Sequence, residues 1–378
     1  MVVFFLVVFS VYGLVNFYIA FHGWRALPAD SSWRTAYLVV FLFFSLSFIA
    51  GRFLERAWIS PLSEALVWIG SYWLAAMLYF FLAAVLVDIL RLITAIAGPS
   101  DMIDTVRSQR QWILAGVVSC VSMLLLVGHI NAASPRVRPL EIKIGKQFGG
   151  DSSLRIVAAS DIHLGTVIGR KRFDRIVETI NGLKPDLVLF PGDIVDEDLA
   201  PVIRENLGES LRSVKARYGL YAITGNHEYI GGADAACRYL EEHGITVLRD
   251  STATLPNGLQ LVGRQDRSSR QFAGQQRKSL EELMAAVDRT KPVLLLDHQP
   301  FHLDEAVEAG VDLQLSGHTH HGQLWPFNYI TGAIYEISWG YERRGSTHFY
   351  VSSGVGTWGP PVRLGNRPEI LLITLRGI

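Results

Sequence analysis

The sequence predicts two domains of different class, an all-α transmembrane domain of four helices at residues 1–134 and an α/β domain at residues 154–378. Three observations lead to this prediction. Apolar runs of about 20 residues recur before residue 134. After residue 154, short apolar stretches alternate with amphipathic ones, and polar side chains gather where the apolar stretches end. At 378 residues, the chain has room for both domains.

The first domain is predicted from the length of its apolar runs, which cover about residues 2–22, 36–54, 65–87 and 111–130. A bilayer core requires about 20 apolar residues in a helix. A cleavable signal peptide would be one short run near the start, so four successive runs indicate an integral membrane domain. Their length also disfavours buried helices of a soluble protein. Asp88, at the end of the third run, is expected to mark the water interface.

Four spans place both ends of the membrane domain on the same side of the bilayer. Basic residues are almost equally divided between the two sides, so the positive-inside rule alone does not decide the orientation. Arg107 and Arg110 precede the fourth run and a polar segment, residues 131–135, follows it, as in a signal anchor whose positive end stays inside. The α/β domain is therefore expected on the extracytoplasmic side.

Charge, cysteine content and span polarity argue against other classes of protein. The formal net charge is zero, so nothing global predicts a nucleic-acid partner. Cys120 lies in an apolar run and Cys237 in a polar, helix-like segment, which predicts neither a disulfide nor a zinc-thiolate pair. Polar residues within the spans are sparse, which argues against a transporter.

The second domain is predicted to begin after a linker, residues 135–153, that contains two prolines and a pair of glycines. Apolar periodicity then predicts strands and helices in alternation. The strands are expected at residues 154–159, 187–190, 218–224, 293–296 and 311–315, the helices at residues 172–183, 233–243 and 279–289, and a tail of strands and turns at residues 345–375. Ser279 and Glu282 fit a capping box at the start of the last helix.

Each predicted strand ends in side chains able to bind a metal ion, and ligand sites of α/β sheets lie beyond the carboxyl ends of strands. A set of Asp, His and Asn without Cys suits Mn, Fe, Zn or Co. A carboxylate such as Asp193 is able to bridge two cations about 3.5–4 Å apart, as two-metal hydrolases require. If the backbone is extended through residues 318–320, both flanking histidines point to the same side. The side chains are Asp161, His163, Asp193, Asp196, Asn226, His227, Glu228, His298, His318, His320 and His321.

Five ordered motifs carry a resemblance to a known family. They are Asp161-x-His163, Gly192-Asp193-x-x-Asp196, Gly225-Asn226-His227-Glu228, His298 and Gly317-His318-x-His320. With them, residues 150–376 resemble the calcineurin-like metallophosphoesterases, and segments 220–229 and 353–361 resemble the bacterial subgroup that includes YkuE and YaeI. The resemblance implies a four-layer αββα metallophosphoesterase sandwich, an α/β (α+β) fold with two mixed sheets, and a place in the bacterial cytoplasmic membrane.

The resemblance also implies a role for each motif residue. His227 would not bind metal but would stabilise or protonate the leaving oxygen, oriented by Asp196 or Glu228. One ion would be held by Asp161, His163, Asp193 and His320, and the second by Asp193, Asn226, His298 and His318.

Residues beside the motifs are assigned less specifically. Arg363 is a candidate phosphate clamp, because arginine offers a bidentate fork, or else a plain surface residue. His321 stands where many relatives are expected to have glycine, and a solvated loop residue is favoured over a substrate contact. Trp325, Trp339 and Trp358 are expected to pack in the core.

The sequence thus predicts a membrane-anchored phosphoesterase with two divalent ions, with manganese the first choice for an assay. Its substrate is expected to be a phosphoester or pyrophosphate on a lipid or envelope component, since the anchor restricts the domain to the membrane surface. The alternative is a non-enzymatic sensor or envelope module that keeps the metal-binding fold, and the intact ligand set argues against it.

Overall fold

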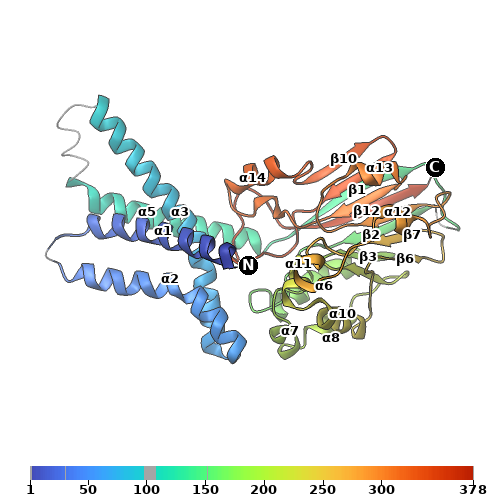
Figure 1. Ribbon diagram of the computed structural model, residues 1–378, viewed down its shortest axis with the longest axis horizontal. Coiled ribbons are helices and arrows are strands. Elements are labelled where there is room, and N and C mark those ends of the chain that lie inside the picture. Colours follow the sequence, from blue (N-terminus) through green and yellow to red (C-terminus); the bar gives the residue numbers. More distant parts are fainter. Residues whose placement is uncertain (1, 30, 98–107, 151, 378) are drawn as a thin grey trace. The chain divides into compact units, whose positions relative to one another are not determined.

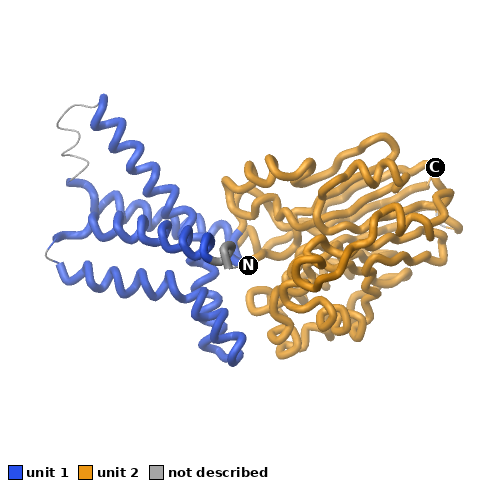
Figure 2. Tube along the Cα trace, viewed as in Figure 1, with its two compact units in different colours: residues 1–129, 359–362 blue, residues 130–358, 363–378 orange. Residues whose placement is uncertain are grey.

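The computed structural model describes residues 2–29, 31–97, 108–150 and 152–377. Arg107, which enters the orientation argument, lies outside them. The chain forms two compact units, residues 1–129 with 359–362 and residues 130–358 with 363–378 (Figure 2).

Within its described residues, the first unit contains four helices that are long and apolar enough to cross a membrane. The third is 37 residues long and exceeds the span predicted for it. The helices α2 and α3 approach closely at Gly70, where an added Cβ would meet the backbone of Phe48, as expected where small residues bring membrane helices together. The four helices are α1 (Val2–Ala26), α2 (Trp33–Ala57), α3 (Pro61–Ala97) and α5 (Arg110–Ala132) (Figure 1).

Asp88 lies inside α3, which continues to Ala97. It accepts a hydrogen bond from the Tyr18 hydroxyl (2.6 Å), and its carboxylate lies 3.0 Å from His22 Nε2 and 3.4 Å from Arg91 Nη1. The helix therefore continues past Asp88, beyond the predicted end of the third run at residue 87. The partners on α1 explain how a carboxylate is accommodated between two apolar helices.

The second unit contains two six-stranded mixed sheets, as the sequence predicts for a sandwich. The first has the order β1-β12-β2-β3-β4-β5 and the second the order β10-β11-β9-β8-β7-β6. The strands of the first sheet are β1 (Arg136–Ile144), β2 (Ser153–Ala158), β3 (Leu187–Pro191), β4 (Leu220–Ile223), β5 (Ile245–Val247) and β12 (Glu369–Gly377). Those of the second are β6 (Ser251–Thr254), β7 (Gln260–Gly263), β8 (Val293–Leu296), β9 (Leu313–Ser316), β10 (Gly340–Arg344) and β11 (Thr347–Val351).

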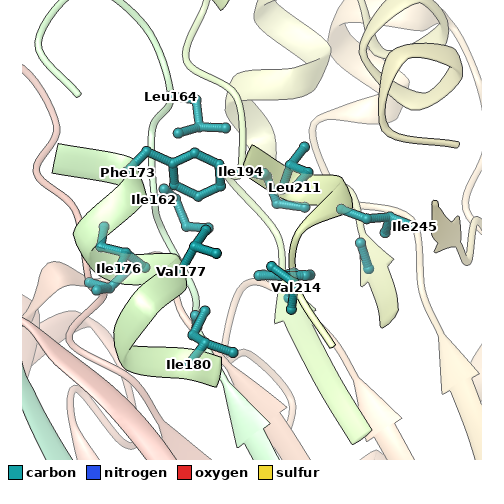
Figure 3. Close-up of a cluster of buried hydrophobic side chains, with 14 of the residues drawn as sticks. Ile162, Leu164, Phe173, Ile176, Val177, Ile180, Ile194, Leu211, Val214 and Ile245 are labelled. Carbon is teal, nitrogen blue, oxygen red and sulfur yellow. The ribbon is translucent and has the colours of Figure 1, made fainter. Parts of the chain in front are cut away.

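Three apolar clusters hold the four layers together. The middle cluster contains side chains of both sheets, such as Ile156 and Leu294, and so lies between them. On the outer side of the first sheet, Phe173, Ile176 and Ile180 of one helix pack against strand residues (Figure 3). The outer cluster on the first sheet includes residues of α6 (Arg170–Gly182), α7 (Ala200–Arg204), α8 (Leu207–Arg212) and α10 (Ala233–Glu242), and that on the second includes residues of α12 (Leu280–Met284) and α13 (Asp304–Glu308). The other described α-helices of this unit are α9 (Asn226–Gly231), α11 (Ser269–Ala273) and α14 (Phe327–Ile334).

Two elements differ from the sequence prediction. The segment expected to be a linker contains strand β1, which pairs in parallel with β12 at the edge of the first sheet. Pro139 is tolerated there because an edge strand leaves one row of N–H groups unpaired. Helix α12 has the predicted capping box, but it ends at Met284 instead of residue 289. The Gln260 side chain bonds both the N–H (3.0 Å) and the C=O (2.6 Å) of Asp288, which removes that backbone from a helix.

Candidate metal centre and active site

Seven side chains predicted as metal ligands converge from five loops that follow β2, β3, β4, β8 and β9. Each of three contacts joins a loop of the first sheet to a loop of the second. His163 Nε2 lies 3.0 Å from His320 Nε2, and Asp193 Oδ2 lies 3.1 Å from His298 Nε2. Asn226 Oδ1 lies 2.8 Å from His318 Nδ1. The site is therefore formed where the carboxyl ends of strands from both sheets meet.

The backbone at this edge is unusual. Asp161, His163, Asp193, His318 and His320 all have φ between 45° and 70°, in the left-handed region that non-glycine residues rarely adopt. The segment from His318 to His320 was predicted to be extended, and the structure shows that it is not. Its two rings reach the site from residues in the left-handed region. Such conformations cost about 1–3 kcal/mol each and cluster at functional sites.

The possible ligand atoms fall into groups whose members lie within 4.8 Å of one another. Asp161, His163 and His320 form one group, and Asp193, His298 and His318 form another. A third group joins His163 and Asp193 to His227, so Asp193 belongs to more than one of them. These clusters are consistent with a dinuclear metal site in which Asp193 is the shared carboxylate.

His298 provides a test of whether a cation fits. Its Nδ1 lies 2.7 Å from the Pro191 carbonyl, which only accepts, so Nδ1 carries the proton. In a neutral ring, Nε2 is then an acceptor, fully buried and without a hydrogen-bond partner, facing the Asp193 carboxylate. Two acceptors facing each other in a buried site repel unless a cation lies between them. The arrangement fits a metal ion bound by both.

His227 lies beside the ligand groups and is held by a carboxylate. Its Nδ1 lies 3.0 Å from Asp196 Oδ1 and 3.9 Å from Glu197 Oε1. Burial disfavours the charged imidazole, but Asp193 and Asp196 outweigh it and raise the pKa of His227 to about 9. The T-shaped contact between the His227 and His163 rings, with centroids 4.5 Å apart, places His227 against a ligand candidate.

Glu228 has a different role from the one the sequence left open for it. Its carboxylate accepts hydrogen bonds from the backbone N–H groups of Asp193 (3.1 Å), Val195 (2.9 Å) and Gly225 (2.7 Å). Burial, followed by repulsion from Asp193, raises the pKa of Glu228 to about 7. Glu228 therefore ties together the loops after β3 and β4, while Asp196 is the carboxylate in contact with His227.

Two glycines are needed because the loops approach so closely. A Cβ at Gly225 would meet the Asp193 side chain, and a Cβ at Gly317 would meet the side chains of Ser160 and Asp161. Any side chain at either position would separate the loops that carry the ligands.

Arg363 is fully buried, so its guanidinium is not presented to solvent as a phosphate clamp. It donates to His320 Nδ1 (3.0 Å) and to the carbonyl groups of Gly354 (3.3 Å) and Gly356 (2.8 Å). His321 is half-buried and its Nδ1 lies 3.1 Å from Ser338 Oγ.

The three tryptophans expected in the core are partly exposed instead: Trp325 by 50%, Trp339 by 39% and Trp358 by 53%. Trp358 lies against His227, with ring centroids 5.9 Å apart. The sequence favoured core packing of Trp358 over a place along an apolar substrate groove, although its position in the glycine-rich segment 354–361 was a signal for the second. Tyr335, whose ring is 5.9 Å from that of His318, had no such signal.

Comparison with known proteins identifies the family. Residues 154–322 match the calcineurin-like phosphoesterases. A "transmembrane protein with metallophosphoesterase domain" of Danio rerio is 31% identical over 375 residues, which cover 94% of this chain and 83% of that protein. An uncharacterized metallophosphoesterase of Campylobacter jejuni is 28% identical over 387 residues, 99% of this chain and 98% of that protein. The uncharacterized metallophosphoesterase YkuE of Bacillus subtilis is 34% identical over 245 residues, 60% of this chain and 80% of that protein.

The first two alignments cover nearly the whole chain and so include the apolar helices as well as the catalytic fold. The chain therefore belongs to the calcineurin-like metallophosphoesterases, with an intact His/Asp metal site and four N-terminal apolar helices.

Proposed function

We propose that this chain hydrolyses a phosphoester or pyrophosphate bond of a lipid- or envelope-linked substrate at the membrane surface. The observation that carries the hydrolytic part is the convergence of three groups of possible ligand atoms, two of which contain Asp193 and one of which contains His227. The observation that motivates the lipid-linked part is the set of four candidate spans, because an anchor confines the domain to substrates that reach the bilayer surface.

Two divalent ions, from the series Mn, Fe, Zn and Co, would be held as the motifs imply. Asp161, His163 and His320 with Asp193 would hold one ion; Asn226, His298 and His318 with Asp193 would hold the other. Such a pair supplies a nucleophile at neutral pH and neutralises the charge that develops on the phosphoryl group.

The protein's own groups would complete the reaction. His227, held at Nδ1 by Asp196, would protonate or stabilise the oxygen that leaves phosphorus. Glu228 would keep the Asp193 and Asn226 loops in register through its three backbone hydrogen bonds. Arg363 would hold the His320 ring at Nδ1. We place the catalytic domain on the extracytoplasmic side of the bacterial cytoplasmic membrane, on the strength of the basic residues before α5.

The test uses the full chain in detergent with each metal in turn, starting with Mn²⁺. Hydrolysis of bis-p-nitrophenyl phosphate and p-nitrophenyl phosphate would establish the activity and separate diesterase from monoesterase. Matched phosphoesters with and without a long acyl chain, presented in vesicles, would then test the lipid link. Equal turnover of the acylated and soluble esters would remove the lipid-linked part of the proposal. A folded chain that binds two metal ions but cleaves none of these esters would favour the sensor alternative.

A further inference from the structure

Apart from the metal centre, the phosphoesterase domain contains a polar pocket beside the loop that follows β8. Its volume is about 430 Å³. We call it the basic pocket, because five of its side chains are cationic. They are Arg264, Arg267, Arg270, Arg277 and Lys278.

The positive charge of the basic pocket exceeds its negative charge. Two carboxylates line the pocket, Glu282 and Glu305. Glu282 is used by the capping box of α12, and Glu305 accepts from Arg264 Nη1 (2.8 Å). A third carboxylate, Asp297, is shared by two arginines: Arg264 Nη1 lies 3.2 Å from it, and Arg277 binds both of its oxygens. Five cations thus face three carboxylates, all of them already bonded.

Two guanidinium groups of the pocket have a buried Nε donor without a partner among the described residues. Arg264 is 6% exposed, and its Nε has no hydrogen-bond partner among the residues that the structure describes. The same holds for Arg267 Nε. Arg267 makes one long bond, to the Phe301 carbonyl at 3.4 Å, and its guanidinium lies over the Phe301 ring. Burial, followed by repulsion from Arg277, lowers the pKa of Arg267. A buried donor next to like charges is costly unless an anion binds there.

The basic pocket adjoins the metal centre. Asp297, the carboxylate that Arg264 and Arg277 share, directly precedes His298 in the sequence. A second connection runs through aromatic rings. The His318 ring contacts Tyr335 (centroids 5.9 Å apart), Tyr335 contacts Phe301 (4.7 Å), and Arg267 lies 5.3 Å from the Phe301 centroid. Three successive side-chain contacts therefore join the basic pocket to His318, a ligand candidate of the metal centre.

We propose that the basic pocket binds a phosphate group of the substrate other than the one that is hydrolysed, so that the substrate class carries at least two phosphate groups. The inference rests on the proposed phosphoesterase activity and specifies its substrate. Phosphate is the favoured anion because a planar guanidinium matches its oxygens in a bidentate fashion, and several arginines are available at once.

The test compares matched synthetic diesters on the full, metal-loaded chain in detergent. Each is a p-nitrophenyl alkyl phosphodiester that ends in either a phosphate or a hydroxyl, with short, medium and long alkyl spacers. At one or more spacer lengths, the terminal phosphate should raise kcat/KM by about tenfold or more, the usual scale of hydrogen bonds to charged groups. The double variant Arg267→Gln/Arg270→Gln should lose this preference, so that it cleaves phosphate-ended and hydroxyl-ended diesters with equal kcat/KM. Arg238→Gln, an exposed arginine on α10, is the matched control and should keep the preference.

Three results would overturn the inference. The first is no preference for the phosphate-ended diester at any spacer length, and the second is an equal fall in kcat/KM for both diesters of a matched pair in the double variant. The third is that the diesters are cleaved without preference, while free inorganic phosphate changes the rate in a way that depends on Arg267. The last would make the pocket a site for a free anion. If neither these diesters nor the esters that test the proposed function are cleaved, the proposed function fails, and calorimetry still decides the pocket. Alkanediol bisphosphates should then bind the metal-loaded chain about tenfold tighter than the matched monophosphates, through Arg267 and Arg270, and equal affinities would refute the inference.

Discussion

The metal centre and the basic pocket lie on either side of the loop after β8, and their unmatched charges have opposite sign. At the metal centre, Nε2 of a neutral His298 is an acceptor that faces the Asp193 carboxylate, an arrangement that fits a cation. In the basic pocket, Nε donors of Arg264 and Arg267 have no partner among the described residues and lie among other cations, an arrangement that fits an anion. A buried polar atom without a partner is costly. Whether that atom is an acceptor or a donor therefore indicates whether the ligand that would satisfy it is a cation or an anion.

The two regions also differ in how they are positioned. Five ligand candidates of the metal centre are placed by left-handed backbone, whereas no arginine of the basic pocket has a positive φ. Arg264 and Arg277 are held by side-chain ion pairs with Asp297, and Arg264 also by one with Glu305. We therefore expect changes at the metal centre to affect chemistry most, and changes at the pocket to affect stability and substrate choice.

The largest effect is expected for Asp193→Ala, which removes the ligand that the groups share. Hydrolysis of bis-p-nitrophenyl phosphate should fall about a thousandfold or more, as expected when several kcal/mol of charge stabilisation is lost. Metal analysis should show fewer than two bound ions. Asp198→Ala in the same loop, a carboxylate that bonds only its own turn, is the control. Unchanged metal content would contradict a bridging role for Asp193.

Asp297→Asn should destabilise the domain by about 3–5 kcal/mol, because it leaves two buried guanidinium groups without their shared charge. Thermal unfolding measures this loss. Added sulfate should restore more stability to the variant than to the wild type, since an anion replaces the missing carboxylate. Asp304→Asn, which removes an exposed carboxylate near Arg344, is the control. No stabilisation of either protein by sulfate would show that the pocket does not bind anions.

His227→Ala should lower the rate about a hundredfold with the metal content unchanged, as expected for a proton donor that is not a ligand. Asp196→Asn should lower the rate by a smaller factor, and Glu197→Gln by the smallest. Glu197 lies 3.9 Å from His227 Nδ1 and is more exposed than Asp196. Initial rates together with metal analysis test this order. Loss of metal in His227→Ala would make His227 a ligand instead.

Glu228→Gln should cost about 1–3 kcal/mol in the free energy of unfolding, because an amide cannot accept all three backbone hydrogen bonds of the carboxylate. Urea unfolding gives the value, with the exposed Glu241→Gln as the control. A change within error of the control would show that these bonds do not hold the two loops together.

Much of the fold could be predicted because its signals are local. Four apolar runs became four helices, and the strands that carry the ligands lie close to their predicted positions. Strand β1 could not be predicted: Arg136, Arg138 and Pro139 read as a loop, and the partner strand begins only at Glu369. Pairing with a distant strand stabilises a segment whose own residues have little preference for it.

The candidate site likewise combines features that local sequence predicted with features that only the folded structure shows. Motif spacing named the seven ligand candidates, which the structure brings together from five loops. It did not show that Arg363 is buried against His320, nor that Trp358 lies beside His227. The basic pocket was missed because isolated arginines in loops usually indicate solvated surface, and only folding brings Arg264, Arg267 and Arg277 together.

The sequence by itself determined the membrane helices, since span length depends only on consecutive apolar residues, and the identity and order of the ligand candidates. The tertiary structure decided which carboxylate holds His227, which loops Glu228 joins, and where positive charge remains unmatched. These features depend on distances between loops far apart in the chain. The distances are set by two sheets packed on a common apolar core, which no local pattern encodes.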